Sequence, residues 1–334
     1  MEMTHTRRRF LASAAAVGVA GLVDARPLHA EPPPETTTVR IAKYTGPSVC
    51  DAPKYVAAEL LRAEGFSDVR YVEHPGAGDL DFDSLFSPSW ISWIDSGGEP
   101  WNEPWTVLMG LHSGCLQIIA NDSIQTVADL RGKRVGVDDL TSSSTGYQLA
   151  TLMVAYVGLD PRKDIEWIQG GKASLVKLLA GGEIDAFLST PPDPQEALAR
   201  KIGHSILDTA LDPPWSQYYC CMMGGATDFV SKYPVATKRV VRAFLKAADI
   251  CQSQPALAAR AVFDYGITTQ YDYALEGLTG ARYDRWRDFD PEDTLRFFAL
   301  RMKEVGFIKS TPQQIIANGT NWQFLNELKR ELKT

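Results

Sequence analysis

The chain of 334 residues is 45% hydrophobic, which is enough to bury either one large core or the cores of two lobes. Its 22% charged and 10% aromatic residues exclude a disordered, fibrous or low-complexity protein. The formal charge is −7 and becomes about −9 without the first 30 residues, which argues against binding to nucleic acid or to an anionic membrane. A small solute is therefore the expected partner.

The first 30 residues are typical of an export signal. Arginines in Thr6-Arg7-Arg8-Arg9-Phe10-Leu11-Ala12 precede an Ala- and Gly-rich apolar stretch, and Leu28-His29-Ala30 resembles a small-x-small cleavage site. The apolar stretch has about 13 residues, whereas a membrane-spanning helix needs roughly 20. We predict a twin-arginine signal peptide over residues 1–30, a disordered linker over residues 31–38, and a periplasmic mature protein.

Periodicity predicts strands that alternate with helices over the first part of the mature chain. The expected strands are 39–44, 69–72, 80–85, 106–111, 116–120, 135–137, 165–168 and 186–188. The expected helices are 51–64, one that begins at 88–90, 145–157 and 175–179. This alternation is typical of parallel sheets covered on both faces, so the expected fold class is α/β.

After Lys232 the pattern becomes helical, and no further convincing strand follows. The expected helices are 235–253, 255–265, 271–277, 291–305, 312–317 and 321–332. We expect residues 39–120 and 218–334 to form lobe 1, and residues 121–217 to form lobe 2. Two hinge strands, at Leu116–Asn121 and Gln217–Gly225, would then join the two rigid lobes.

Three segments resemble the substrate-binding proteins of the aliphatic-sulfonate, nitrate and taurine transporters, a group related to the fungal thiamine-pyrimidine synthases. They are Val127–Val137 (VADLRGKRVGV), Gly182–Phe187 (GEIDAF) and Tyr233–Arg239 (YPVATKR). Their order and spacing agree with the family over most of residues 39–309. The resemblance implies a type II periplasmic binding protein fold and an ABC transporter permease as partner. We expect the binding protein itself to be a monomer.

Ligand contacts are expected just after the predicted strands, because ligands of open α/β sheets bind beyond the carboxyl ends of the strands. The hydroxyl-rich run 139–146 opens a helix, where the helix dipole favours an anionic or carbonyl group. An ordinary N-cap is the alternative for this run, and a structural role is the alternative for His112. Asp138 and Asp139 leave the charge of the ligand open. The candidates after the strands are Ser89, His112, Ser113, Gly114, Ser142, Ser143, Ser144, Thr145 and Thr190.

Three aromatic residues near predicted strand ends or loops are candidates for stacking on a ligand ring. They are Tyr44, Trp90 and Trp215, and the alternative is that they pack in the core. If they line the pocket, the solute has an organic body, such as a sulfonate, a pyrimidine-like compound or an aromatic acid. A bare inorganic anion would not need them.

Five cysteines occur in the chain, and their spacing indicates neither a metal site nor a disulfide framework. They are Cys50, Cys115, Cys220, Cys221 and Cys251, and the sequence does not choose pairs among them. On a strand, Cys220 and Met222 would face one way and Cys221 and Met223 the other. Such soft ligands suit copper(I) or iron, but a buried strand explains them without any metal.

An enzyme is the alternative function, because the resembling synthases carry a cysteine-rich run in a comparable region. A thiamine-pyrimidine precursor synthase would hold a cofactor or iron. This chain departs from that pattern, since Met222 and Met223 stand where further cysteine is expected. The synthases also use a histidine and a lysine beside the first strand, where this chain has Lys43 and Lys54 but no nearby histidine. Motifs of hydrolases, metalloproteases and nucleotide-binding proteins are also missing from the sequence. We therefore predict a non-catalytic binding protein without metal or cofactor.

Overall fold

The computed structural model describes residues 31–44, 50–73, 75–76, 78–98, 102–170 and 174–332. The predicted signal peptide lies outside these residues. The chain from Pro34 onward forms one compact unit. Among the described helices, none has both the length and the apolar character that crossing a membrane would require.

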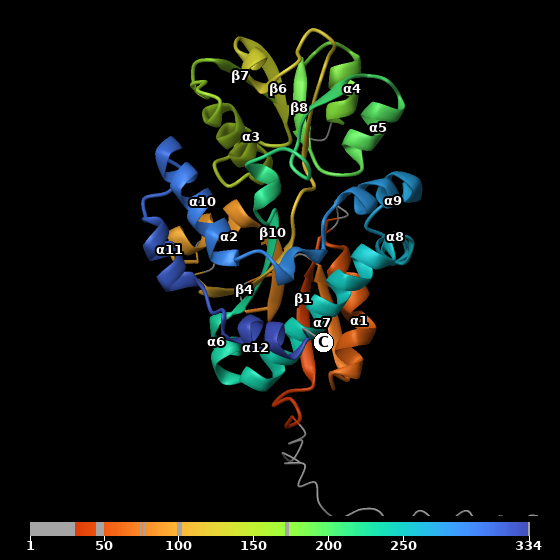
Figure 1. Ribbon diagram of the computed structural model, residues 1–334, viewed down its shortest axis with the longest axis vertical. Helices are drawn as coiled ribbons and strands as arrows, with labels where there is room; N and C mark the ends of the chain where they lie inside the picture. The colour runs from red at the N-terminus through yellow and green to blue at the C-terminus, as the bar shows by residue number, and fades with distance from the viewer. Residues whose placement is uncertain are drawn as a thin grey trace, which may run out of the picture. The chain divides into compact units, whose positions relative to one another are not determined.

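Two five-stranded sheets organise this unit, which agrees with the predicted α/β class (Figure 1). The first sheet has the order β2-β1-β3-β10-β4, with β1 Thr38–Lys43, β2 Asp68–Glu73, β3 Phe82–Phe86, β4 Trp105–His112 and β10 Cys221–Ala226. The second has the order β7-β6-β8-β5-β9, with β5 Gln117–Ala120, β6 Lys133–Val137, β7 Ile165–Gln169, β8 Ala186–Ser189 and β9 His204–Asp208.

Helices follow most of the strands and then make up the C-terminal third of the chain (Figure 1). Those of the strand-rich part are α1 Ala52–Ala63, α2 Ser87–Ser96, α3 Thr145–Tyr156, α4 Leu175–Ala180 and α5 Asp193–Ala199. Those after β10 are α6 Thr227–Lys232, α7 Pro234–Ser253, α8 Pro255–Asp264, α9 Tyr271–Gly280, α10 Pro291–Val305, α11 Pro312–Gly319 and α12 Gln323–Glu331.

Each sheet is mainly parallel, as expected, and contains one antiparallel strand whose direction the sequence did not indicate. β10 runs antiparallel between β3 and β4, and β5 runs antiparallel between β8 and β9. Both are the strands that the chain forms directly after it leaves the other sheet. The predicted hinge strand Leu116–Asn121 is therefore wrong, because β5 pairs inside the second sheet and the crossing lies at residues 113–116. The return crossing lies at residues 209–220, and β10 belongs wholly to the first sheet.

One short strand and two short α-helices escaped prediction, and each has a weak pattern. β9 is partly buried at an edge of the second sheet, so its apolar alternation is poor. α5 and α6 have 7 and 6 residues with few large apolar side chains, whereas the equally short α4 (LVKLLA) was predicted from its apolar pattern. The long helices, by contrast, lie within one or two residues of their predicted bounds, except that α9 ends at Gly280, three residues beyond the prediction.

Each sheet is stabilised by an equivalent ion pair. Arg40 of β1 donates from its backbone N–H and its guanidinium to Asp81, with the shortest side-chain contact at 2.7 Å. Arg134 of β6 makes the same three hydrogen bonds to Asp185, with the shortest side-chain contact at 2.8 Å. Asp81 stands just before β3 and Asp185 just before β8, so the pairs fix β3 beside β1 and β8 beside β6.

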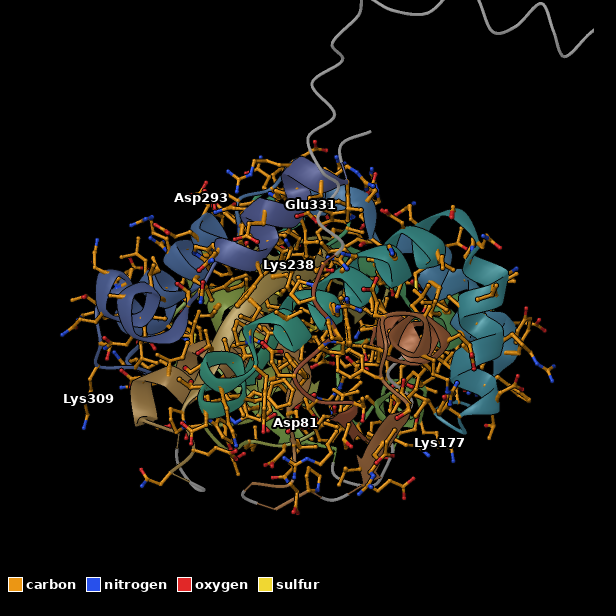
Figure 2. All side chains as sticks on the ribbon, turned by 90° about the horizontal axis from the view of Figure 1, so that it is seen from below. Asp81, Lys177, Lys238, Asp293, Lys309 and Glu331 are labelled. Carbon is orange, nitrogen blue, oxygen red and sulfur yellow. The ribbon has the colours of Figure 1, made fainter. Side chains whose placement is uncertain are left out.

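The linker predicted over residues 31–38 is wrong at Glu35, which is docked on α7. The carboxylate of Glu35 accepts hydrogen bonds from the backbone N–H groups of Val235 and Ala236, at 2.9 and 2.8 Å, where α7 begins. Burial works against this charge, but the two N–H donors outweigh it and lower the pKa of Glu35. At the other end of the chain, Glu331 of α12 pairs with Lys238 of α7 at 2.6 Å (Figure 2). Both segments are therefore anchored on α7.

Candidate functional site

The predicted ligand contacts gather along two sheet edges that the crossing segments connect. The carboxyl ends of β1, β3 and β4 share an edge of the first sheet with the start of antiparallel β10. The carboxyl ends of β6, β7 and β8 share an edge of the second sheet with the start of β5. Residues 113–116 and 209–220 run between these edges, so side chains from both sheets can reach one region.

The hydroxyl-rich run lies at the N-terminus of α3, as predicted. Ser142 and Ser143 are exposed, and Ser144 is the N-cap, whose hydroxyl accepts a hydrogen bond from the backbone N–H of Tyr147 at 3.5 Å. One serine therefore has the capping role that was the alternative for this run. Thr190, after β8, is half-buried beside a cis Pro191–Pro192 bond. Ser142 and Ser143 keep hydroxyls open to solvent at a helix N-terminus.

Two candidate residues touch each other from helices that follow strands of different sheets. The hydroxyls of Ser89 in α2 and Thr145 in α3 lie 2.7 Å apart in a hydrogen bond. Beside them, the Gln148 side-chain amide donates to the hydroxyl of Ser92 at 2.8 Å. A second contact of this kind joins Gln270, just before α9, to Glu196 in α5, where the Gln270 side-chain amide lies 3.5 Å from the Glu196 carboxylate. These contacts hold helices of the two sheets together.

We expect the Ser89–Thr145 hydrogen bond to couple the two helices energetically. In a double-mutant cycle with Ser89→Ala and Thr145→Val, the coupling should be about 1 kcal/mol in the free energy of unfolding, measured by urea denaturation. Ser96→Ala is the control, because its hydroxyl bonds only to Trp93 within α2. The control should add to Thr145→Val without coupling. Additive losses for Ser89 and Thr145 would contradict a bond between them.

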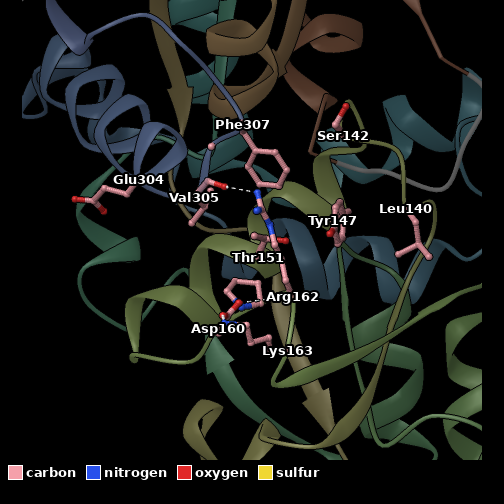
Figure 3. Close-up of a pocket in the computed structure, with 12 residues that line it drawn as sticks. Leu140, Ser142, Tyr147, Thr151, Asp160, Arg162, Lys163, Glu304, Val305 and Phe307 are labelled. Atoms are coloured by element: carbon pink, nitrogen blue, oxygen red, sulfur yellow. Dashed lines mark hydrogen bonds and ion pairs between the residues drawn. The ribbon is translucent and has the colours of Figure 1, made fainter.

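A groove of about 730 Å³ lies where α3 and the following loop meet the end of α10 (Figure 3). Ser142 lines it together with Tyr147, Arg162, Glu304 and Phe307. The Arg162 guanidinium donates to the backbone carbonyl of Val305 at 3.3 Å, which joins the two walls. The groove presents charges of both signs beside aromatic rings, so its lining alone does not select a ligand charge.

The aromatic candidates differ in their burial. Trp90 is 1% exposed and its indole N–H donates to the carbonyl of Met222 at 2.8 Å, while Trp215 is 5% exposed and packs against Tyr156 and Phe297. Both tryptophans are thus core residues in this structure. Tyr44 is 43% exposed and borders a cavity of about 90 Å³ whose lining also includes Trp90. Tyr44 is the candidate whose ring remains accessible.

A buried charge network beneath Tyr44 was not predicted. Lys54 of α1 has no exposed surface, and its ammonium contacts Asp83 at 2.8 Å and Asp51 at 3.4 Å. The Tyr44 hydroxyl donates to Asp83 at 2.5 Å, and the Tyr44 ring centroid is 4.9 Å from the Lys54 ammonium. Periodicity placed Lys54 on a helix, but only the fold shows that β3 delivers a carboxylate to it.

Burial and the neighbouring charges shift the pKa values of this network. Burial raises the pKa of Asp83, and Lys54 opposes that shift. Burial by itself would lower the pKa of Lys54, but the carboxylates of Asp51 and Asp83 outweigh it, so the pKa is raised. Burial, together with Asp83, also raises the pKa of Tyr44. The ammonium therefore stays charged at neutral pH and is held by its two carboxylates.

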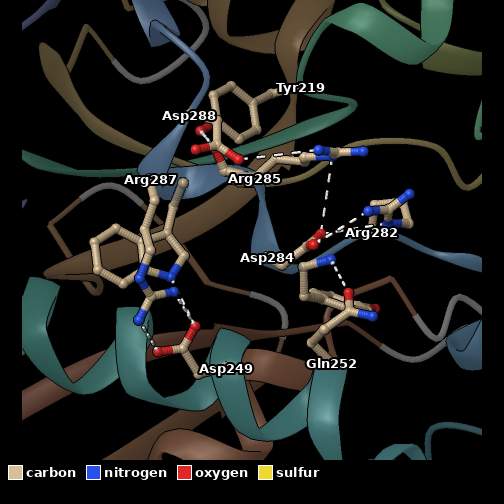
Figure 4. Close-up of polar contacts among 10 residues, drawn as sticks. Tyr219, Asp249, Gln252, Arg282, Asp284, Arg285, Arg287 and Asp288 are labelled. Carbon is tan, nitrogen blue, oxygen red and sulfur yellow. Dashed lines mark hydrogen bonds and ion pairs between the residues drawn. The ribbon is translucent and has the colours of Figure 1, made fainter. Parts of the chain in front are cut away.

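His112, Ser113 and Gly114 lie buried at the first crossing. Ser113 exchanges two backbone hydrogen bonds with Arg282, at 3.0 and 3.1 Å. The segment that follows Arg282 is itself anchored, since Arg287 pairs with Asp249 of α7 at 2.7 Å and Tyr219 donates to the carbonyl of Arg285 at 3.0 Å (Figure 4). These backbone contacts give Ser113 a structural place at the crossing, and His112 and Gly114 are buried beside it.

Cys220 and Cys221 do not point to opposite faces of a strand, as their alternation predicted. Cys220 lies just before β10, and the β10–β4 register shifts between Cys221 and Met222. Both Cys220 and Cys221 consequently approach Cys115, with the Cys220 and Cys115 sulfurs 2.9 Å apart. All five cysteines are buried and none forms a disulfide in this structure. Spacing could not reveal this cluster, because its members come from separate segments.

Comparison with known proteins places the chain in a family. The model of the NMT1-like family matches residues 67–263, more than half of the chain. The periplasmic nitrate-binding protein NrtA from Synechocystis PCC 6803 superposes with a TM-score of 0.75 at 15% identity, covering 90% of each chain. The alkanesulfonate-binding protein SsuA from Xanthomonas axonopodis pv. citri, bound to MOPS, gives a TM-score of 0.64 at 14% identity, covering 88% of this chain and 99% of that one.

A sequence relative is the nitrate import ATP-binding protein NrtC of Synechocystis sp., which is 24% identical over 220 residues. The match covers 62% of this chain, and the chain spans about a third (32%) of the length of that relative. The structural likenesses confirm the type II fold that the three sequence segments implied. The chain belongs to the NMT1-like family and has the fold of periplasmic binding proteins.

Proposed function

We propose that this protein is the periplasmic solute-binding component of an ABC importer and captures one small organic solute between its two sheets. The observation that carries the proposal is the pair of sheets of identical strand order, joined by two crossings, whose helices meet through Ser89 and Thr145. A ligand that adds contacts to both sides shifts the equilibrium toward the closed form by its differential affinity.

The transport role rests on the relatives. One structural neighbour is named a periplasmic nitrate-binding protein, another binds MOPS, a sulfonate, and the sequence relative is named a nitrate import ATP-binding protein. With the twin-arginine pattern of residues 1–30, these names support export to the periplasm and delivery of the solute to a membrane permease.

An organic solute is proposed because the accessible face of Tyr44 suits a ring or an apolar body, while the N-terminus of α3 suits an anionic or carbonyl group. A sulfonate, a pyrimidine-like compound or an aromatic acid combines both features. The two lysines near β1 favour a binding protein over a synthase that would use a reactive lysine. Lys54 is paired with two carboxylates, and Lys43 pairs with Glu73 at 2.7 Å.

A thermal-shift screen tests this function. We expect one class among nitrate, sulfonates, pyrimidines and aromatic acids to stabilise the protein, by about 2.7 kcal/mol at 100 times its dissociation constant. The double variant Ser142→Ala/Ser143→Ala should weaken that shift, because it removes the open hydroxyls at α3. Ser253→Ala is the control, since this exposed serine bonds only within α7. Absence of any shift in protein that mass spectrometry shows to be ligand-free would contradict solute binding by these classes.

A further inference from the structure

Four cysteines and one histidine converge at the point where the crossings leave the first sheet. Cys50 precedes α1, His112 ends β4, Cys115 lies in the first crossing, and Cys220 and Cys221 stand where β10 begins. All five side chains are buried. Their ligand atoms form two groups, Cys50–His112–Cys115 and Cys115–Cys220–Cys221, in each of which every pair of atoms lies within 4.8 Å. Cys115 belongs to both groups.

The imidazole of His112 is an independent observation that points to a ligand at this cluster. The side chain is fully buried, and neither of its ring nitrogens has a hydrogen-bond partner among the described residues. Burying an unsatisfied polar group costs about 1–3 kcal/mol, and native proteins rarely tolerate it. Thiols are weak hydrogen-bond partners, so the surrounding cysteines do not remove this cost. A metal ion would satisfy one of the nitrogens.

The donor set selects the kind of metal. Sulfur and imidazole nitrogen without a carboxylate oxygen are the ligands of thiophilic ions, whereas Mg²⁺ and Ca²⁺ require oxygen. Full burial and more than three available ligands match a closed structural site better than an open catalytic one. We propose that the cluster centred on Cys115 binds one thiophilic d¹⁰ metal ion, Zn(II) or Cu(I), through cysteine sulfur and His112.

A disulfide between Cys115 and Cys220 is the competing explanation. Their separation of 2.9 Å exceeds the S–S bond of about 2.05 Å and falls short of the roughly 3.8 Å between two thiolates on tetrahedral zinc. Metal binding would therefore move the two sulfurs apart by just under ~1 Å. A disulfide would consume two of the five ligands and leave His112 unsatisfied, which is why the metal accounts for more of the cluster.

Such an ion would have a definite effect on the fold. Its ligands come from the start of α1, the end of β4, the first crossing and the beginning of β10. One ion would therefore fasten the start of the first crossing and the end of the return crossing to the first sheet. This role is separate from solute capture, so the ligand screen and the metal experiment can succeed or fail independently.

Metal binding by the reduced full-length chain tests the proposal. The protein is purified without oxygen, stripped with a chelator and titrated with Co(II), a spectroscopic substitute for Zn(II), and separately with Cu(I) against a competing chelator. We expect one ion per chain by elemental mass spectrometry in at least one arm. A tetrahedral cobalt–thiolate spectrum would assign zinc, and stoichiometric Cu(I) uptake without that spectrum would assign copper; both results support the site.

Matched variants separate this site from adventitious thiol binding. Cys115→Ser should weaken binding by about 100-fold or more, because it removes the shared ligand. Cys251→Ser should bind as the wild type does, since Cys251 is equally buried but belongs to neither group. If Cys115→Ser does not fold, His112→Asn provides the same test through a changed cobalt spectrum. The proposal is overturned by a reduced wild type that retains neither ion, by equal binding in Cys115→Ser and Cys251→Ser, or by a Cys115–Cys220 disulfide that persists under reducing purification.

Discussion

Replacing Lys54 with methionine is expected to lower the free energy of unfolding by about 3–5 kcal/mol at pH 7. The ammonium is fully buried between Asp83 and Asp51, at 2.8 and 3.4 Å, and the substitution leaves both carboxylates without their cation. Removing one partner of a buried ion pair is costly because the remaining charge can neither reach water nor find another partner. Urea denaturation measures the loss.

The pH dependence of this loss has a definite sign. Burial already raises the pKa of Asp83 above its ordinary 3.8, and losing Lys54 removes the group that opposes the shift. An acid whose pKa is raised by folding gains stability as pH falls, so the deficit of Lys54→Met should shrink between pH 7 and pH 4. The pKa of Lys54 is raised above 10.5, so the wild type keeps its advantage at neutral pH and loses it only at higher pH.

Two control variants define the result. Lys177→Met removes an exposed lysine of α4 and should change stability by less than about 0.5 kcal/mol (Figure 2). The double variant Lys54→Met/Asp83→Asn should lose less stability than the sum of the two single variants, because the charge of Asp83 is gone and only Asp51 keeps a charge without its cation. A Lys54→Met protein within ~1 kcal/mol of the wild type at pH 7 would show that the pair does not stabilise the fold.

The substitution Gly114→Ala is expected to destabilise the protein by about 3 kcal/mol or more. Gly114 has φ +68°, in the left-handed region, and a Cβ built on it would collide with the backbone of Ala210. Because Gly114 lies in the first crossing and Ala210 in the return crossing, the two segments would have to separate. The midpoint of thermal or urea unfolding measures the effect.

Gly182→Ala isolates the cause of that loss. Gly182 has nearly the same φ, +71°, but its added Cβ would meet no described atom within 4 Å. This control carries only the conformational strain, about 1 kcal/mol. If the two variants lose the same stability, the close approach of the crossings has no energetic importance, and backbone strain explains both.

The strong periodic elements were predictable from sequence, and the weak ones were not. α10 occupies Pro291–Val305 as expected, since a proline at its start and Gly306 after its end accompany a clear apolar stripe. β9 was missed, because an edge strand that is only partly buried lacks the alternation that marks a strand. The direction of β5 and β10 was also beyond the sequence, since the same residues can pair parallel or antiparallel.

In the candidate site, too, local features were predictable from the sequence and contacts between distant segments were not. Hydroxyls at the start of α3 followed from the local sequence, because a strand, a serine-rich turn and a helix are all local patterns. Their contact with Ser89, the burial of Trp90 and Trp215, and the Lys54–Asp83 pair depend on segments far apart in the chain. No local pattern records which distant segment will pack against a residue.

The sequence by itself determined the α/β class, most element bounds and, through three short segments, the kind of binding-protein fold. These features depend on periodicity and capping, which act over a few residues. Only the tertiary structure decided that one antiparallel strand enters each sheet, that Glu35 docks on the start of α7, and that Cys50, His112, Cys115, Cys220 and Cys221 meet. Such contacts arise when the apolar faces of many elements are buried together, so their partners are set by the whole packing and not by neighbours in the chain.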